Sequence, residues 1–137
     1  MKIALCGSIS AGQEILTIKT QLETAGHEVE IPESLKHEHL KNRTEVSVEE
    51  KAQDKIKHDL IRRHFEKIKT SDCVVVVNVD KRGVKNYIGG NTFLEMGFAH
   101  VLNKKIYCLN PLPQMAYTAE LAGMQPIILN GDLSLIK

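Results

Sequence analysis

Short apolar runs alternate with amphipathic stretches along the chain. Lys2 to Cys6 is an apolar run, and the small-residue turn Gly7 to Gly12 follows it. Apolar side chains then recur at helical spacing as far as Gly26, so the pattern predicts a strand, a turn and a helix. A second short strand is predicted at Val29 to Ile31, where Pro32 ends it.

A polar, charged stretch from residue 33 to residue 44 predicts a surface loop. A single long helix is expected from about Ser47 to about Thr70, and Ser47-Val-Glu-Glu50 has the spacing of a capping box at its start. Its apolar positions recur along one side and are expected to face the core: Ala52, Ile56, Leu60, Ile61, Phe65 and Ile68.

The second half of the chain continues this alternation. The unbroken run Cys73 to Val77 is typical of a strand covered on both faces, as central parallel strands are. The stretch from Gly83 to Leu102 predicts a glycine-rich turn and a helix. The remaining elements are expected to be a strand at Lys105 to Leu109, a helix at Ala116 to Met124, a strand at Pro126 to Leu129 and a terminal turn at Asp132 to Lys137.

Strands that alternate with helices favour a parallel sheet between two layers of helices. We therefore predict one α/β domain over residues 1–137, a three-layer Rossmann-like sandwich around a five-stranded, mostly parallel sheet. Ligands of such sheets bind outside the carboxyl ends of the strands. The turns after the first, third and fourth predicted strands are expected to converge on one crevice.

Composition narrows the class of protein. The 18 basic and 17 acidic side chains leave a formal charge of +1, which argues against a nucleic-acid polymer or an anionic membrane as partner. Cys6, Cys73 and Cys108 form no Cys-x-x-Cys motif and lie in or beside apolar runs, so we interpret them as buried thiols in a reducing cytoplasm. No apolar run approaches about 20 residues, so we expect neither a signal peptide nor a membrane span.

The turn from Gly7 to Gly12 is a candidate binding loop. It offers backbone N–H groups and the hydroxyls of Ser8 and Ser10 at a helix N-terminus, where a phosphate or a sugar can be held. The turn matches neither the dinucleotide-binding glycine pattern nor a Walker loop. A bare turn with a helix cap is an equally good interpretation of the pattern alone.

Glu95 has two interpretations. Thr92-Phe-Leu-Glu95 has the spacing of a capping box, in which the glutamate only returns a hydrogen bond to the start of its own helix, and spacing alone favours this. However, Gly89, Gly90 and Asn91 come directly before it and place the carboxylate at the predicted crevice. There it could act as nucleophile or electrostatic partner for an oxocarbenium-like centre.

Further candidates have both structural and functional readings. His64 lies in the middle of an apolar helical arc, where a hydrogen-bonded core histidine is the usual outcome, but it could also transfer a proton. Asn78 and Asp80 could bind ribose hydroxyls or simply form a strand-end turn. His37-Glu-His39 together with His27 invites a metal interpretation. Adjacent histidines in a polar loop without a cysteine seldom form a closed site, so we predict no metal.

Four segments together resemble the nucleoside 2-deoxyribosyltransferase superfamily, which includes 2'-deoxynucleoside 5'-phosphate N-hydrolases. They are Leu5 to Ile9, Ser71 to Val77, Phe93 to Ala99 and Lys104 to Ile106. The resemblance implies a flavodoxin-like fold, a homodimer or higher homo-oligomer, and cleavage or exchange of an N-glycosidic bond without cofactor. It also implies that Glu95 corresponds to the catalytic glutamate of the family.

The chain also departs from the family pattern. His64 stands where the family carries a catalytic aspartate, and Ser10 where the N-hydrolases carry an arginine for the 5'-phosphate. A tyrosine of the family is here Ala4 or Leu5. The hydroxyl that a partner subunit lends to the site corresponds loosely to Thr118 or Tyr117.

We therefore expect cleavage or transfer at the N-glycosidic bond of a (deoxy)nucleoside or nucleoside 5'-monophosphate. Glu95 is expected to attack or stabilise C1', while His64 handles the proton. The residues expected to bind substrate are Cys6, Gly7, Ser8, Ile9, Ser10, Asn78, Asp80, Gly89, Gly90, Asn91 and Thr118.

Two alternatives stay open. The missing aspartate motivates a non-catalytic nucleotide-binding sensor. The run Gly89-Gly-Asn-Thr-Phe-Leu-Glu95 resembles the Gly-Gly-x-Gly-Thr-x-x-Glu motif of lysine-decarboxylase-like phosphoribohydrolases, which implies a ribonucleotide substrate.

Overall fold

A single parallel sheet organises the protein. The computed structural model describes residues 1–36 and 47–137. Its strands follow the order β2-β1-β3-β4-β5, and each pair of neighbours is parallel. Every predicted strand is confirmed, with ends that differ by at most one residue. The bounds are β1 (Lys2–Cys6), β2 (Glu28–Glu30), β3 (Cys73–Val76), β4 (Lys105–Cys108) and β5 (Ile127–Ile128).

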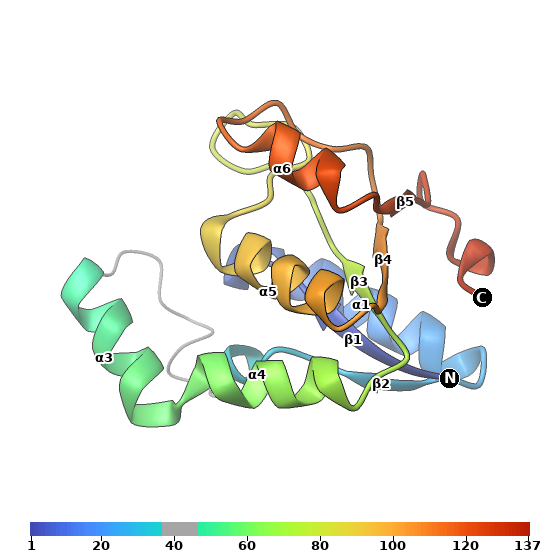
Figure 1. Ribbon diagram of the computed structural model, residues 1–137. Helices are drawn as coiled ribbons and strands as arrows, with labels where there is room; N and C mark the ends of the chain where they lie inside the picture. The colour runs from blue at the N-terminus through green and yellow to red at the C-terminus, as the bar shows by residue number, and fades with distance from the viewer. Residues whose placement is uncertain (37–46) are drawn as a thin grey trace.

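Helices cover both faces of the sheet (Figure 1). Side chains of a strand alternate between faces, so Ile3 and Leu5 pack with α1 (Gly12–Thr24), whereas Ala4 and Cys6 point to the opposite face. That second face carries α4 (Leu60–Lys69), α5 (Gly90–Val101) and α6 (Thr118–Gly123). Helix, sheet and helix make the predicted three-layer sandwich, and its strand order is the flavodoxin-like one.

The strand order creates a topological switch point between β1 and β3. The chain leaves β1 toward β2 on one side and continues from β3 toward β4 and β5 on the other. Cys6, the last residue of β1, is in register with Val76, the last residue of β3. The carboxyl ends of these two strands therefore define the place where such folds bind ligands.

The prediction of one long helix from Ser47 to Thr70 is wrong, because the structure divides this segment into two helices. α3 (Val48–His58) ends at Asp59, whose φ of 49° and ψ of 43° are left-handed and interrupt the helix, and α4 starts at the next residue. The predicted cap is confirmed, since the Ser47 side chain accepts a hydrogen bond from the Glu50 N–H. α3 projects away from the sheet (Figure 1), and Ile56 on it is 72% exposed, so the expected apolar arc does not continue through this helix.

Single turns of 3-10 helix join several of these elements. η1 (Ile9–Ala11) lies between β1 and α1, and η3 (Leu133–Leu135) lies in the expected terminal turn. η2 (Glu33–Leu35) begins the stretch expected to be a surface loop. In the described part of the chain, no helix is long and apolar enough to cross a membrane.

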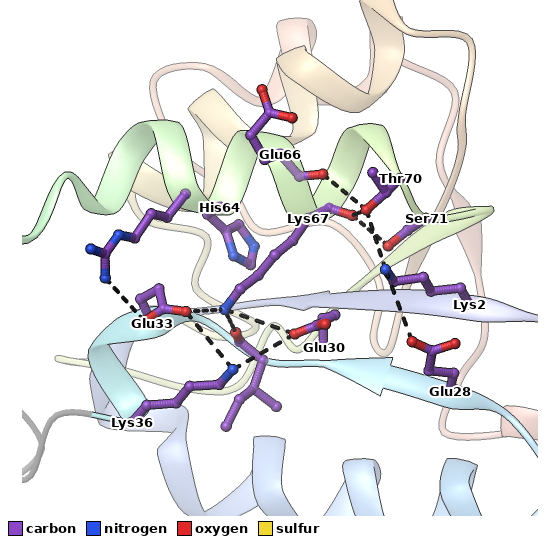
Figure 2. Close-up of polar contacts among 12 residues, drawn as sticks. Lys2, Glu28, Glu30, Glu33, Lys36, His64, Glu66, Lys67, Thr70 and Ser71 are labelled. Atoms are coloured by element: carbon purple, nitrogen blue, oxygen red, sulfur yellow. Dashed lines mark hydrogen bonds and ion pairs between the residues drawn. The ribbon is translucent and has the colours of Figure 1, made fainter.

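A polar network fixes α4 against the segment after β2 (Figure 2). The Lys67 ammonium donates to the carbonyl of Ile31 at 2.7 Å and lies 2.8 Å from a carboxylate oxygen of Glu33. Arg63 and Lys36 also reach Glu33, at 3.8 Å each. Because Lys67 and His64 project from the same side of α4 in Figure 2, this network also orients the helix that carries His64.

Candidate active site

Three buried polar side chains meet at the carboxyl end of β1. Cys6 ends β1, His64 lies on α4 and Glu95 lies on α5, and their exposed fractions are 0%, 3% and 5%. The Cys6 Sγ atom lies 3.4 Å from His64 Nε2, and the same nitrogen lies 3.2 Å from Glu95 Oε2. Residues from three distant parts of the chain thus form one cluster at the switch point of the sheet.

Local sequence patterns bring these side chains to the same place. Cys6 shares the sheet face of Ala4 because residues two apart on a strand point the same way. His64 stands one helical turn before the buried Ile68, so it faces the sheet as the apolar arc predicts. Glu95 stands one helical turn before the fully buried Ala99, which packs in the core on the sheet side of α5.

The capping-box interpretation of Glu95 is wrong. α5 begins at Gly90 and its N-cap is Gly89, so Asn91 and Thr92 lie inside the first turn and do not cap the helix. Gly89 adopts an extended conformation, and its carbonyl accepts the hydrogen bond from the N–H of Phe93. Glu95 therefore lies in the second turn, past the third helical position that the glutamate of a capping box occupies, and its side chain is buried.

The Glu95 carboxylate has two differently placed oxygens. Oε1 accepts a hydrogen bond of 2.8 Å from the Asn91 side-chain amide, one helical turn earlier. Oε2 is buried and has no hydrogen-bond partner among the described residues, although His64 Nε2 is near. A buried carboxylate oxygen without a donor keeps its lone pairs available, and this is the property that a nucleophile needs.

The Cys6 thiol is the neutral member of this cluster. Burial raises its pKa well above the ordinary value, and the neighbouring Glu95 carboxylate raises it further. At neutral pH the side chain is therefore a protonated thiol that faces the imidazole and the carboxylate. Sequence reasoning had included Cys6 only among the substrate-binding residues, and it missed the contact with His64.

The first predicted binding turn lies directly after Cys6. A Cβ atom at Gly7 would lie 3.0 Å from Ile15 Cδ1 and 3.2 Å from the Val77 carbonyl oxygen, both closer than usual contacts, so the packing around this turn favours glycine. The hydroxyls of Ser8 and Ser10 lie 2.7 Å apart, and Ile9 is 41% exposed. The turn thus presents hydroxyl groups at the carboxyl edge of the sheet, at the start of η1 and α1.

The hydrogen bonds of Asn78 favour the turn interpretation over the ribose-binding one. Its side-chain amide donates to the carbonyls of Asn110 and Pro111 at 2.8 and 3.1 Å, and its oxygen accepts from the Asn110 N–H at 3.0 Å. The residue is fully buried, and these bonds join the ends of β3 and β4. The amide is committed to backbone groups, so we interpret Asn78 as a structural residue.

The side chains of Asp80 and Thr118 also form hydrogen bonds with backbone groups of their own turns. One Asp80 carboxylate oxygen accepts from the N–H of Asn86, and the residue is exposed. The Thr118 hydroxyl bonds to backbone groups of Pro113 and Met115 at the start of α6. Tyr117 beside it stacks on Phe93, at 4.6 Å between ring centroids. Among the predicted residues, contact with Glu95 is seen for Cys6, His64 and Asn91.

Sequence reasoning missed one further polar residue near the site. The Lys55 ammonium on α3 lies 3.5 Å from the Asn91 side-chain oxygen, at the N-terminal turn of α5. No spacing signal links residues of these two helices, and the break at Asp59 was not foreseen. Of the histidines considered for a metal, His37 and His39 lie outside the described residues, while His27 Nδ1 lies 3.2 Å from the amino group of Met1.

Comparison with known proteins places the fold. No family model and no curated protein matches the sequence. Among solved structures, a 2-deoxyribosyltransferase from Bacillus psychrosaccharolyticus aligns with a TM-score of 0.57 and 20% identity, over 81% of this chain and 73% of that chain. A CMP N-glycosidase from Clostridium botulinum aligns with a TM-score of 0.51 and 19% identity, over 93% of this chain and 85% of that chain.

A third solved structure agrees with these two. The 2-desoxiribosyltransferase from Leishmania mexicana aligns with a TM-score of 0.53 and 12% identity, over 81% of this chain and 67% of that chain. At these identities the likeness establishes a shared fold. The fold that the sequence resemblance implied is therefore confirmed.

Proposed function

We propose that the protein cleaves or transfers the N-glycosidic bond of a nucleoside or a nucleoside 5'-monophosphate, as a member of the nucleoside 2-deoxyribosyltransferase superfamily. The observation that carries this proposal is the Glu95 carboxylate, buried at the switch point of the sheet, where its Oε2 atom forms no regular hydrogen bond with any residue that the structure describes. The shared fold supports it, since the proteins of known structure include 2-deoxyribosyltransferases and a CMP N-glycosidase.

In this proposal Glu95 is the nucleophile. Loss of a base from a sugar passes through an oxocarbenium-like transition state, which a nearby carboxylate stabilises and then captures at C1'. Asn91 holds Oε1 at 2.8 Å, which leaves Oε2 to form the bond. Water or a second base then releases the sugar, with net retention of configuration at C1'.

The proposed role of His64 follows from its distance to Glu95. In a displacement with retention, the nucleophile and the leaving base lie on opposite faces of the sugar. The His64 Nε2 atom is 3.2 Å from the attacking oxygen, so it lies on the face of the nucleophile. We therefore assign His64 to orienting the carboxylate, in place of the expected proton transfer to the base. In this assignment the departing base takes its proton from water.

Substrate recognition is assigned to the turns at this edge of the sheet. The backbone N–H groups and hydroxyls of the turn from Gly7 to Ser10 suit a sugar or a 5'-phosphate, and the glycine-opened start of α5 suits the sugar. These assignments, which include Gly89 and Gly90, stay predictions. We also propose a homo-oligomer and, because all cysteines are free, a reducing cytoplasmic location.

Release of free base tests the function. The wild-type chain is incubated with cytidine, deoxycytidine, CMP, dCMP and the matching purine compounds, with and without a second base as acceptor. Base release identifies a hydrolase, and exchange identifies a transferase. Release from ribonucleotides alone would favour the phosphoribohydrolase alternative. Saturable binding without any release would establish the non-catalytic sensor and overturn the proposal.

A further inference from the structure

We propose that Cys6, His64 and Glu95 also form a binding site for a thiophilic divalent cation, with Zn²⁺ as the preferred ion. The potential ligand atoms, one from each side chain, all lie within 4.8 Å of one another. Zinc bonds to sulfur at about 2.3 Å and to nitrogen or oxygen at about 2.0–2.2 Å, so neighbouring donors of a tetrahedral site lie about 3.3–3.7 Å apart. The separations of 3.4 and 3.2 Å around His64 Nε2 need only small adjustments to fit.

A second observation is the state of the polar atoms themselves. Glu95 Oε2 is buried without a hydrogen-bond partner in the described part of the chain, and it faces the same small space as Cys6 Sγ and His64 Nε2. A buried acceptor that His64 Nε2 approaches without forming a regular hydrogen bond is costly, and an ion is one of its ordinary explanations. The site therefore has both the spacing and the unsatisfied acceptor of a cation site.

The donor set selects the type of ion. Binding of the ion would displace the proton of the Cys6 thiol into solvent. The resulting thiolate and the imidazole are soft or borderline ligands that favour zinc, whereas calcium and magnesium require several oxygen ligands. Among the described residues, no other cluster of cysteine, histidine and carboxylate groups has this spacing. With three protein ligands, a fourth coordination position is left for water or another small ligand.

A bound cation has a direct consequence for the proposed function, and this consequence alone rests on that function. The metal would occupy the Glu95 oxygen assigned to attack C1', so the cation-bound protein is expected to be inactive. Zinc is thus an inhibitor that competes for the nucleophile, and a chelator is expected to restore base release. The binding itself does not depend on the identity of the substrate.

The test uses the full chain after removal of metals. Titration with Co²⁺ is expected to give one tight site with a near-ultraviolet sulfur-to-cobalt charge-transfer band, and Zn²⁺ is expected to displace the cobalt at a ratio of one to one. Cys6→Ser and Cys6→Ala are both expected to abolish the band, because they remove the sulfur ligand. Glu95→Gln is expected to weaken affinity at least about tenfold, as is usual for the loss of metal-site contacts.

Two control variants locate the binding. Cys73→Ser replaces another buried thiol, at the opposite end of the sheet beside Met1, and is expected to keep the band unchanged. A double variant with His37→Asn and His39→Asn removes the histidine pair of the segment outside the described residues, and it too is expected to keep the band. Circular dichroism of each variant establishes that it is folded.

The outcomes separate the two proposals. Absence of a charge-transfer band, or a band that survives in folded Cys6→Ser and Cys6→Ala, overturns the cation site. Zinc binding together with no base release from any substrate supports the cation site while it overturns the proposed function. Zinc binding that leaves base release unchanged overturns the inhibitory consequence.

Discussion

The Nε2 atom of His64 lies 3.2 Å from the Oε2 atom of Glu95, although the two residues belong to different helices and are buried side by side on one face of the sheet. Packing of α4 against α5 creates this contact, and Cys6, at the end of β1, contacts His64 from the sheet. A histidine at this distance restricts the orientation of the carboxylate. The first prediction concerns this pair.

His64→Gln is expected to lower kcat for base release by about tenfold to a hundredfold, while KM changes little. The amide can still hold Oε2 in place, but it carries no positive charge at any pH. The loss is therefore expected in kcat alone, and a His64→Ala variant, which cannot hold Oε2 at all, is expected to lose more activity than His64→Gln. A merely structural histidine would lower the free energy of unfolding and leave kcat unchanged in both folded variants.

Asn78→Ala is expected to destabilise the fold by about 2–4 kcal/mol, because it removes the buried hydrogen bonds to Asn110 and Pro111 and leaves their backbone groups unpaired. Urea unfolding measures this loss. The folded fraction of the variant is expected to have the wild-type KM. A large rise in KM with unchanged stability would instead favour the sugar-binding interpretation of this residue.

The ion pair between Glu33 and Lys67 predicts a dependence of stability on pH. The hydrogen bond from Lys67 and its positive charge lower the pKa of Glu33 below its ordinary value. The stabilisation is therefore complete above the unfolded-state pKa, near 4.3, and it is lost as the pH falls through the lower folded-state value. Glu33→Gln should cost about 1 kcal/mol at pH 7, and this difference from wild type should shrink below about pH 4.

Glu28→Gln is the matched control for that measurement. Glu28 lies 4.0 Å from Lys2 with its side chain 72% exposed, so its loss is expected to change the free energy of unfolding by a few tenths of a kcal/mol. Urea unfolding at several pH values measures both variants. A pH-independent loss in Glu33→Gln would show that packing, and not the ion pair, stabilises α4.

The cysteines are expected to be unreactive in the native protein. Burial raises the pKa of Cys73 to about 11 and that of Cys108 to about 12, and it raises the pKa of Cys6 well above its ordinary value. A chromogenic disulfide reagent at pH 8 should detect almost no thiol until denaturant is added, and then all three. Rapid native reaction of one thiol would contradict the burial of that residue.

The fold could be predicted from the sequence because its strands carry strong local signals. The run Cys73 to Val77 and the turns with glycine and proline define the strands, and the alternation with helices defines the topology. The break at Asp59 could not be predicted, since a left-handed conformation at one aspartate does not change the spacing of the apolar residues around it. Spacing also favours Thr92 as the cap of α5, whereas Gly89, which has no side chain, is the N-cap residue.

The residues of the candidate site could be predicted from the sequence, but the contacts between them could not. His64 could be placed on the sheet side of its helix, and Glu95 at the predicted crevice, from helical spacing and from the preceding glycines. Cys6 and His64 are 58 residues apart, and their contact depends on how α4 crosses the sheet, which no local pattern encodes. The structural role of Asn78 also depends on tertiary packing, which brings it against Asn110 and Pro111.

Base release by Glu95→Gln tests the central claim most directly. The substitution keeps the shape of the side chain and removes its charge, while Glu23→Gln on the exposed end of α1 serves as the control. The proposed function predicts that Glu95→Gln releases base at least about a thousandfold more slowly than wild type, whereas Glu23→Gln matches wild type. Wild-type rates of base release in folded Glu95→Gln would contradict the assignment of Glu95 as the nucleophile.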